Sequence, residues 1–222
     1  MEAPNQIKFQ SPIMPQRPVV TPDGQAFRTL FDSVQQKQAA NMDYQPPSPK
    51  TGVAWLEVKS QTPYKDIQQQ LASSKQPTLL KFKQLDHHFA GLKPILTTAQ
   101  QQKQLQHLII RQSRFQHDQV AMVARVLQLN DGIAWLVLDH NDFDDADIDQ
   151  LMTAVPEESN IKHLVLTNNN ISDDGLNHII AALRKMPKLE TIWLADNQLT
   201  QSGIDRLNKG TKNHSSIKTV DV

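Results

Sequence analysis

The sequence predicts an α/β solenoid in which short parallel strands alternate with helices. The first observation is a repeat of apolar motifs, each starting 28 residues after the one before, at Leu105, Ile133, Ile161, Leu189 and Ile217. The second is the pattern inside each motif: positions one, four and six are apolar, as in a strand buried on one face. The third is a helical pattern after each full motif. Each complete unit therefore supplies a strand, a turn and a helix.

Residues 1–50 have a different character. Eight of the 13 prolines lie in the first 49 residues, and proline fixes its own φ and disfavours helix in the residue before it. We expect a Pro-rich N-terminal arm with one short helix at about 22–40, capped by Thr21. We interpret that helix as an N-terminal cap on the repeat domain at 51–222, because the ends of stacked domains need covers. A partner-binding peptide is the alternative.

Residues 51–104 carry more degenerate copies of the motif. The segment Val53-Ala-Trp-Leu-Glu-Val58 closely resembles Ile133-Ala-Trp-Leu-Val-Leu138. One period before Leu105, Leu80 and Phe82 have the spacing of two buried strand positions. The domain at 51–222 is therefore predicted to hold about seven strand-bearing repeats.

The helical halves begin with capping signals. Ser172 precedes an apolar periodicity and is the predicted N-cap of one helix, with Asp144 or Asp145 and Thr200 or Ser202 in the same role in neighbouring repeats. The acid-rich stretch 139–149 also invites a calcium or magnesium site. It lacks the Gly and the bidentate Glu of an EF-hand loop, whereas acids at a helix N-terminus are favoured by the helix dipole. We predict no metal and no cofactor.

The motif LxxLxLxx(N/S)x(L/I/F), followed by a helix at a period of 28, resembles the ribonuclease-inhibitor-like class of leucine-rich repeats. The match is specific over 105–222, weaker over 51–104 and absent from 1–50. The resemblance implies a horseshoe with a concave parallel sheet and convex helices. Asn141, Asn169 and Asn197 recur where each strand ends. We expect their side chains to bond the backbone of adjacent turns, forming a structural ladder.

Composition excludes several function classes. The chain has no cysteine among its 222 residues, so thiol catalysis and Cys-ligated metals are ruled out. Its 23 basic and 23 acidic side chains leave no basic excess for nucleic acid. No apolar run is long enough to span a bilayer, and no signal peptide is visible. Since neither is found, we predict a cytoplasmic location. No catalytic triad or phosphate loop is present, so we predict no enzyme activity and no catalytic residues.

Strand geometry predicts a partner site on the concave face. Positions three, five and seven of each motif point there, and they include all three tryptophans of the chain together with aliphatic side chains. Such a strip has the composition of interface hot spots. Two alternatives are that the indole rings only fill the concave side, or that the N-terminal arm covers them. The predicted partner-binding residues are Trp55, Lys81, Lys83, His107, Ile109, Arg111, Trp135, Val137, Asp139, His163, Val165 and Trp193.

Net charge is zero but unevenly distributed. Residues 1–128 have a net charge of +7, and residues 129–222 have a net charge of −7. The concave positions show the same polarity, which would orient a partner of complementary charge. Ordinary solvation of surface loops is the alternative. The basic positions are Lys59, Lys81, Lys83 and Arg111, and the acidic ones are Asp139, Asp196 and Asp221.

These observations favour a non-catalytic protein–protein interaction module, since stacked repeats supply a preformed surface. One alternative is a regulator of a small GTPase, similar to the GTPase-activating proteins of the same repeat class, with Arg111 and Arg114 as candidate arginine fingers. A third interpretation is a structural or oligomerising protein that self-associates through the open sheet edge at 217–222.

The absence of cysteine, the Gln-rich tracts and the short degenerate repeats resemble leucine-rich-repeat effectors that intracellular bacteria deliver into host cells. The resemblance implies a host protein as the partner, and secretion into the host cytosol without a cleavable signal peptide. The ligase domain of some such effectors depends on cysteine, so it is not expected here.

Overall fold

The structure is a computed structural model that describes residues 55–71, 78–85, 89 and 91–222, without the side chain of Trp55. The predicted N-terminal arm, its helix at 22–40 and its capping role lie outside the described residues. So does the predicted contribution of the Trp55 ring to the partner site.

Seven parallel strands form one sheet in the order of the sequence, as predicted. From β2 to β7, each Cα partner lies 28 residues further along the chain, for example Leu79 opposite His107. Trp55 instead pairs with Leu79, so the first connection is four residues shorter. The strands are β1 (Trp55–Val58), β2 (Leu79–Lys83), β3 (His107–Arg111), β4 (Trp135–Asp139), β5 (His163–Val165), β6 (Thr191–Trp193) and β7 (Thr219–Asp221).

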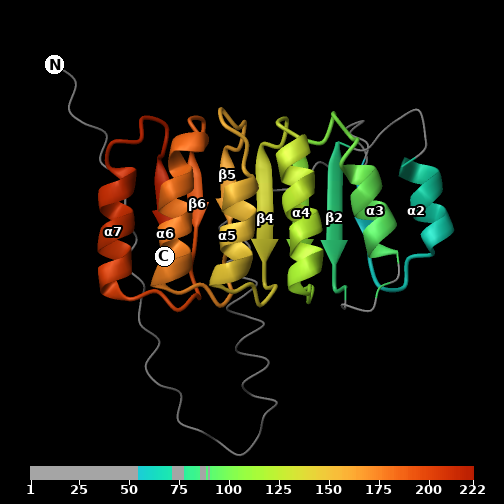
Figure 1. Ribbon diagram of the computed structural model, residues 1–222, viewed down its shortest axis with the longest axis horizontal. Helices are drawn as coiled ribbons and strands as arrows, with labels where there is room; N and C mark the ends of the chain where they lie inside the picture. Colours follow the sequence, from blue (N-terminus) through green and yellow to red (C-terminus); the bar gives the residue numbers. More distant parts are fainter. Residues whose placement is uncertain (1–54, 72–77, 86–88, 90) are drawn as a thin grey trace, which may run out of the picture. The chain divides into compact units, whose positions relative to one another are not determined.

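Six α-helices of the described residues alternate with these strands and lie side by side across one face of the sheet (Figure 1). None of these helices has the length and apolar character needed to cross a membrane. The helices are α2 (Tyr64–Leu71), α3 (Leu92–Ala99), α4 (His117–Leu129), α5 (Asp145–Ala154), α6 (Asp173–Ala182, continued by the 3-10 turn Leu183–Lys185) and α7 (Gln201–Thr211).

The hydrophobic core lies between the sheet and the helices. Leu108 and Ile110 of β3 belong to it, as do Leu136 and Leu138 of β4, whereas the residues between them point the other way. Each fully buried leucine or isoleucine contributes about 1.5–3 kcal/mol relative to an exposed one. We call the face of the sheet that points away from helices α2–α7 the distal face.

The predicted asparagine ladder is confirmed by its hydrogen bonds. The Asn169 amide donates to the carbonyls of Leu138, at 2.7 Å, and Leu166, at 2.9 Å. Its Oδ1 accepts from the backbone N–H groups of Asn141 and Phe143, both at 3.1 Å. One side chain thus satisfies the backbone of two successive turns, which would otherwise hold unpaired buried groups.

Asn141 and Asn197 repeat the arrangement of Asn169. The Asn141 amide donates to the carbonyl of Ile110, and the Asn197 amide donates to that of Leu166. In the repeat before Asn141, Ser113 takes this place and its hydroxyl accepts from the backbone N–H of Leu85. The ladder therefore extends over at least four turns.

The predicted N-caps Asp144, Ser172 and Thr200 are also confirmed, since each side chain accepts from backbone N–H groups at the start of its helix. A second contact joins neighbouring repeats. The Asp145 carboxylate accepts from the N–H of Ser172 at 2.8 Å, and the Asp173 carboxylate accepts from the N–H of Thr200 at 3.0 Å. The first residue of one helix therefore holds the cap of the next.

A left-handed residue follows the seventh motif position in five successive repeats. Gln84, Gln112, His140, Asn168 and Asp196 have φ between 51° and 58°. The first four donate their N–H groups to the carbonyl of the seventh position in the next repeat, at 3.0–3.1 Å. The turn costs about 1–2 kcal/mol for each non-glycine residue, and in return it continues the pairing beyond the strand.

Candidate interaction surface

A ladder of four aromatic rings crosses strands β3 to β6 on the distal face. The imidazole of His107 is stacked on the indole of Trp135, with centroids 6.4 Å apart. Trp135 lies 3.7 Å from His163, and His163 lies 6.2 Å from Trp193, centroid to centroid. The interplanar angles range from 14° to 30°. We call His107, Trp135, His163 and Trp193 the ring ladder.

The register of the sheet positions the ring ladder. His107, Trp135 and His163 are successive Cα partners, so their side chains leave adjacent parallel strands at the same height. The next residue in that row is Thr191, whose Oγ1 lies 2.8 Å from Nδ1 of His163. The ladder then continues through Trp193, two residues further along β6.

All four rings are half-buried. Burial lowers the pKa of both the His107 and His163 imidazoles below the ordinary value. At His163 the charge of Glu190 opposes this shift, while Lys162 and Lys218 add to it. The ladder is therefore uncharged at neutral pH, and its partly exposed rings suit apolar or cationic groups.

Three aliphatic side chains were predicted to be exposed beside the rings, and that part of the prediction is wrong. Ile109, Val137 and Val165 expose 2%, 1% and 0% of their surface. They lie on the distal face outside the core cluster, in the row between the ring ladder and a row of polar side chains. The larger side chains of the two flanking rows cover these short side chains. A position on the distal face therefore does not by itself make a side chain exposed.

Arg111 and Asp139 form the centre of that polar row. The Arg111 guanidinium lies 3.3 Å from the Asp139 carboxylate, which also accepts from Thr167 at 2.7 Å. Nδ1 of His140 lies 2.7 Å from the same carboxylate. Burial by itself would raise the pKa of Asp139, but hydrogen bonds from His140 and Thr167, with the charge of Arg111, hold it below its ordinary value.

The basic end of the distal face is largely compensated too. Glu57 lies 2.9 Å from Nζ of Lys81 and 3.3 Å from Nζ of Lys59. Lys83 lies at the end of β2 and is half-buried. Several charges that the sequence presented as a polarity are therefore joined into ion pairs across neighbouring strands.

The other end of the distal face is acidic. Asp221 is the Cα partner of Trp193 on the neighbouring strand and is half-buried. Burial raises the pKa of the Asp221 carboxyl, and the negative charge of Asp196 raises it further. We call Trp193, Asp196 and Asp221 the acidic pole. Its two acids appeared in the sequence as part of the charge polarity but not as site residues.

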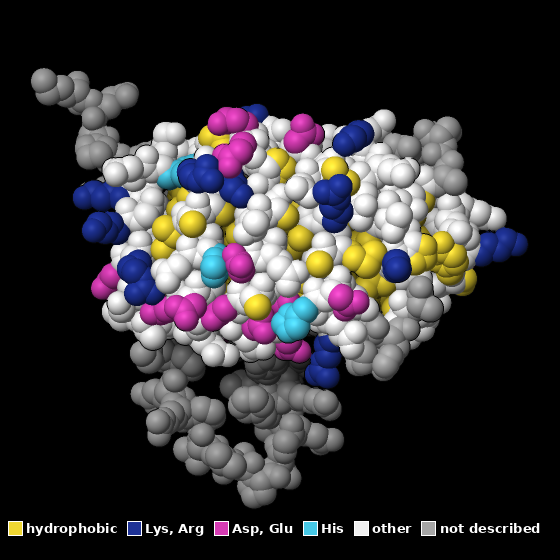
Figure 2. Space-filling view, viewed as in Figure 1, with side chains coloured by type: hydrophobic (Ala, Val, Ile, Leu, Met, Phe, Trp, Pro, Cys, Tyr) yellow, Lys and Arg dark blue, Asp and Glu magenta, His cyan; other side chains and the backbone are white. Residues whose placement is uncertain are grey.

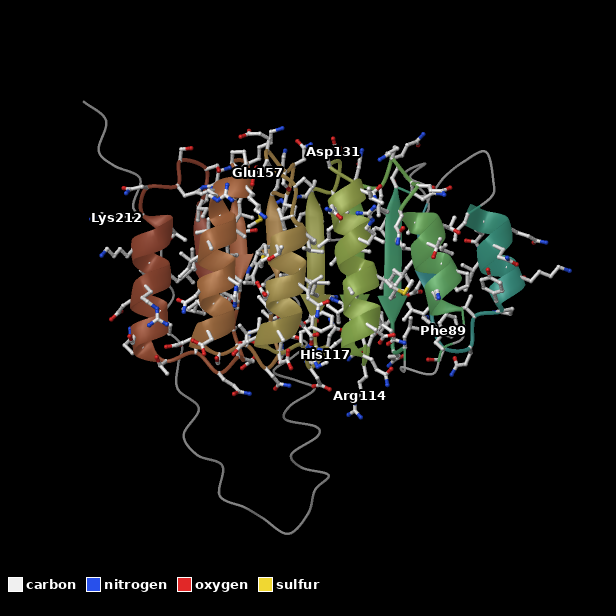
Figure 3. All side chains as sticks on the ribbon, viewed as in Figure 1. Phe89, Arg114, His117, Asp131, Glu157 and Lys212 are labelled. Atoms are coloured by element: carbon white, nitrogen blue, oxygen red, sulfur yellow. The ribbon has the colours of Figure 1, made fainter. Side chains whose placement is uncertain are left out.

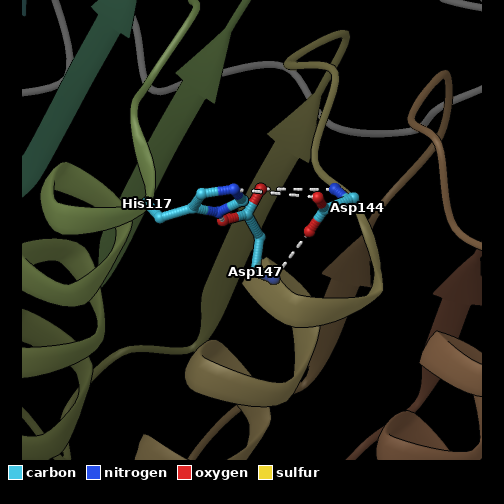
Figure 4. Close-up of side chains that lie close together, drawn as sticks. All are labelled: His117, Asp144 and Asp147. Carbon is cyan, nitrogen blue, oxygen red and sulfur yellow. Dashed lines mark hydrogen bonds and ion pairs between the residues drawn. The ribbon is translucent and has the colours of Figure 1, made fainter.

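A further cluster lies where the helices begin, and it joins α4 to α5 (Figure 4). Nδ1 of His117 lies 2.6 Å from Oδ1 of Asp147, and Nε2 lies 3.9 Å from Oδ2 of Asp144. The hydrogen bond to Asp147 and the charges of both carboxylates raise the pKa of His117.

These three side chains could in principle hold a metal ion. However, Asp144 caps α5 and Asp147 completes the capping box, so helix capping already uses their oxygens. His117 occupies the same repeat position as Asp145 and Asp173 and likewise contacts the next cap. The cluster therefore has a structural explanation, and the lack of a metal stays a prediction.

Arg111 and Arg114, the candidate arginine fingers, both contact carboxylates of the following repeat. The Arg114 guanidinium lies 3.4 Å from the Asp142 carboxylate, and the side chains of Arg114 and Asp142 are exposed. Figure 3 shows Arg114 and His117 at the edge of the sheet where the helices begin, opposite Asp131 and Glu157. In Figure 2 most of the visible acidic side chains gather along the edge where α5 to α7 begin.

No protein-family model matches this chain, and no curated protein matches it. Among solved structures, one described as leiomodin-1 actin-binding site 2 is similar with a TM-score of 0.50 at 15% identity, covering 57% of this chain and 75% of that one. At this identity the similarity concerns the fold alone. A Bacteroides fragilis protein matches with a TM-score of 0.30 at 9% identity, covering 90% of this chain and 83% of the other.

Proposed function

We propose that this chain is a non-catalytic protein-interaction module of the leucine-rich-repeat class. In this proposal the distal face is the concave side of a solenoid and binds a protein partner through the ring ladder. Seven parallel strands in sequence order, with equivalent motif positions paired from one strand to the next, support a stacked repeat.

The single observation that carries the proposal is the half-buried stack of His107, Trp135, His163 and Trp193. Stacking holds each ring in one orientation before any partner arrives, so little side-chain entropy is lost on binding. Tryptophan is also among the residues most enriched in the energetic centres of protein interfaces. A rigid, uncharged aromatic platform therefore favours binding over catalysis.

The fold comparison adds modest support. The similar solved structure is named as an actin-binding site, so a domain of related fold serves protein binding there. The proposed setting, an effector acting on host proteins, rests on the sequence resemblance and stays a prediction.

The test compares proteins recovered from a eukaryotic lysate by wild type, a Trp135→Ala/Trp193→Ala variant and a Tyr64→Ala control. Tyr64 is an exposed aromatic on α2, away from the ring ladder. The proposal expects a partner that wild type and the Tyr64→Ala control recover but the double variant does not. Equal recovery of every protein by all three would contradict it. Stimulated GTP hydrolysis that is lost on Arg111→Ala would favour the regulator instead.

A further inference from the structure

The acidic pole differs from the rest of the distal face in its charge balance. Elsewhere on this face the carboxylates of Glu57 and Asp139 have cationic partners. Within residues 55–71, 78–85 and 91–222, no ion pair joins Asp196 or Asp221 to a lysine, arginine or histidine. The negative charge of Asp196 adds to burial in raising the pKa of the Asp221 carboxyl, and no ion pair with the described residues offsets it.

An aromatic ring lies directly beside these acids. Trp193 and Asp221 are Cα partners, so their side chains leave adjacent strands about 4.8 Å apart on the same face. The indole of Trp193 is half-buried. It is the last ring of the ring ladder and is stacked on His163. A ring face next to a partly desolvated carboxylate attracts a cation by two mechanisms, through the ring quadrupole and through charge.

We infer that Trp193, Asp196 and Asp221 bind an arginine or lysine side chain from a basic segment of the protein partner. This inference rests on the proposed function and specifies one end of the same surface. The cationic group would lie over the indole and between the two carboxylates. Arginine fits better than lysine, because a planar guanidinium can stack on the ring while donating two hydrogen bonds to a carboxylate.

The charge distribution of the chain supports this orientation. Residues 129–222 have a net charge of −7, so their field draws a basic segment toward this half of the domain. The ion pair between Arg111 and Asp139 divides the distal face near β3 and β4. A partner would therefore place its apolar side chains on the ring ladder and its basic side chain beyond Trp193.

The experiment uses isothermal titration of the full chain with acetylated, amidated hexa-arginine as the probe. The variants are Asp196→Asn/Asp221→Asn and Trp193→Leu, each verified by circular dichroism. Asp174→Asn is the control: it removes one exposed carboxylate near the start of α6, outside the pole. Hexalysine of equal charge separates guanidinium recognition from general attraction.

We expect the double Asn variant to weaken hexa-arginine binding by about tenfold or more, and Trp193→Leu by several-fold, with Asp174→Asn within about twofold of wild type. Hexalysine should bind more weakly than hexa-arginine. Equal binding by wild type and the double Asn variant would overturn the inference. So would an equal loss in Asp174→Asn, or no binding at low salt.

The two proposals fail separately. If the partner recovered through the ring ladder binds wild type and the double Asn variant equally, the acidic pole is wrong and the interaction module stands. If no protein depends on the rings but hexa-arginine still requires the two acids, the proposed function fails and the pole remains a cation site.

Discussion

The indole of Trp135 lies 3.7 Å from the imidazole of His163, centroid to centroid, at an interplanar angle of 27°. The two residues are 28 apart in sequence and direct neighbours across β4 and β5. This contact joins the halves of the ring ladder and makes it continuous from β3 to β6. It is the arrangement from which the proposed binding surface follows.

Histidine titration tests the environment of the ladder. We expect the imidazoles of His107 and His163 to titrate below the ordinary value of 6.5 and His117 to titrate above it. A lowered pKa in the folded state means that stability is lost as the pH falls through 6.5 and the unfolded chain gains protons. Two-dimensional NMR of the ring nitrogens, assigned with single His→Gln variants, measures all three. A ladder histidine that titrates above 6.5 would contradict this environment.

The pKa of His117 is shifted in the opposite direction to that of the two ladder histidines. Because its pKa is raised by Asp147 and Asp144, its contact stabilises the fold below pH 6.5 and loses effect as the pH rises through the folded pKa. His117→Gln should therefore lower the melting temperature more at about pH 5.5 than at about pH 8.5. Thermal unfolding of both proteins across this range gives the comparison. A pH-independent difference would show that the charge of His117 does not contribute.

Gly203 makes room for the contact between successive caps. A Cβ at Gly203 would overlap the Asp173 carboxylate, which holds the cap Thr200. We expect Gly203→Ala to destabilise the domain by about 1–3 kcal/mol, although alanine is normally the better helix former. On the same helix, the atoms nearest to a Cβ at Gly210 belong to the Ile180 side chain, which can shift more easily than a carboxylate that holds a cap. Gly210→Ala should therefore change stability by less than about 1 kcal/mol. Urea unfolding compares the two, and equal effects would refute the cap contact.

Among the ladder asparagines of the described residues, Asn169 makes the most side-chain hydrogen bonds to the backbone. Asn169→Ala leaves the carbonyl of Leu138 and the N–H groups of Asn141 and Phe143 without this partner in a buried place. The free energy of unfolding should fall by about 2–4 kcal/mol. Asn170→Ala, one residue along and exposed, should cost less than about 0.5 kcal/mol. A small effect at Asn169 would mean that water replaces the ladder.

Much of the fold could be predicted because its signals are local and periodic. The strands follow from apolar positions such as Leu136 and Leu138, and the helix starts follow from caps such as Ser172. The role of Asn169 followed from its recurrence at the strand end. Such features depend on backbone geometry that each repeat shares, so one copy predicts the others.

The candidate site was harder to predict, because it depends on side chains from different repeats. Alternation correctly placed Val137 on the distal face but could not show that its neighbours bury it. Charge counting could not show that Arg111 and Asp139 would pair. The contact of Asp145 with the following cap also required the register between repeats. Exposure and pairing are properties of the assembled sheet.

Radical footprinting of the full chain with its recovered partner tests the central claim most directly. Oxidation of Trp135 and Trp193 is measured by mass spectrometry with and without the partner, with exposed Tyr64 on α2 as the internal reference. The account predicts that the partner protects both tryptophans several-fold and leaves Tyr64 unchanged. Unchanged oxidation of Trp135 and Trp193 in the complex would contradict binding at the ring ladder.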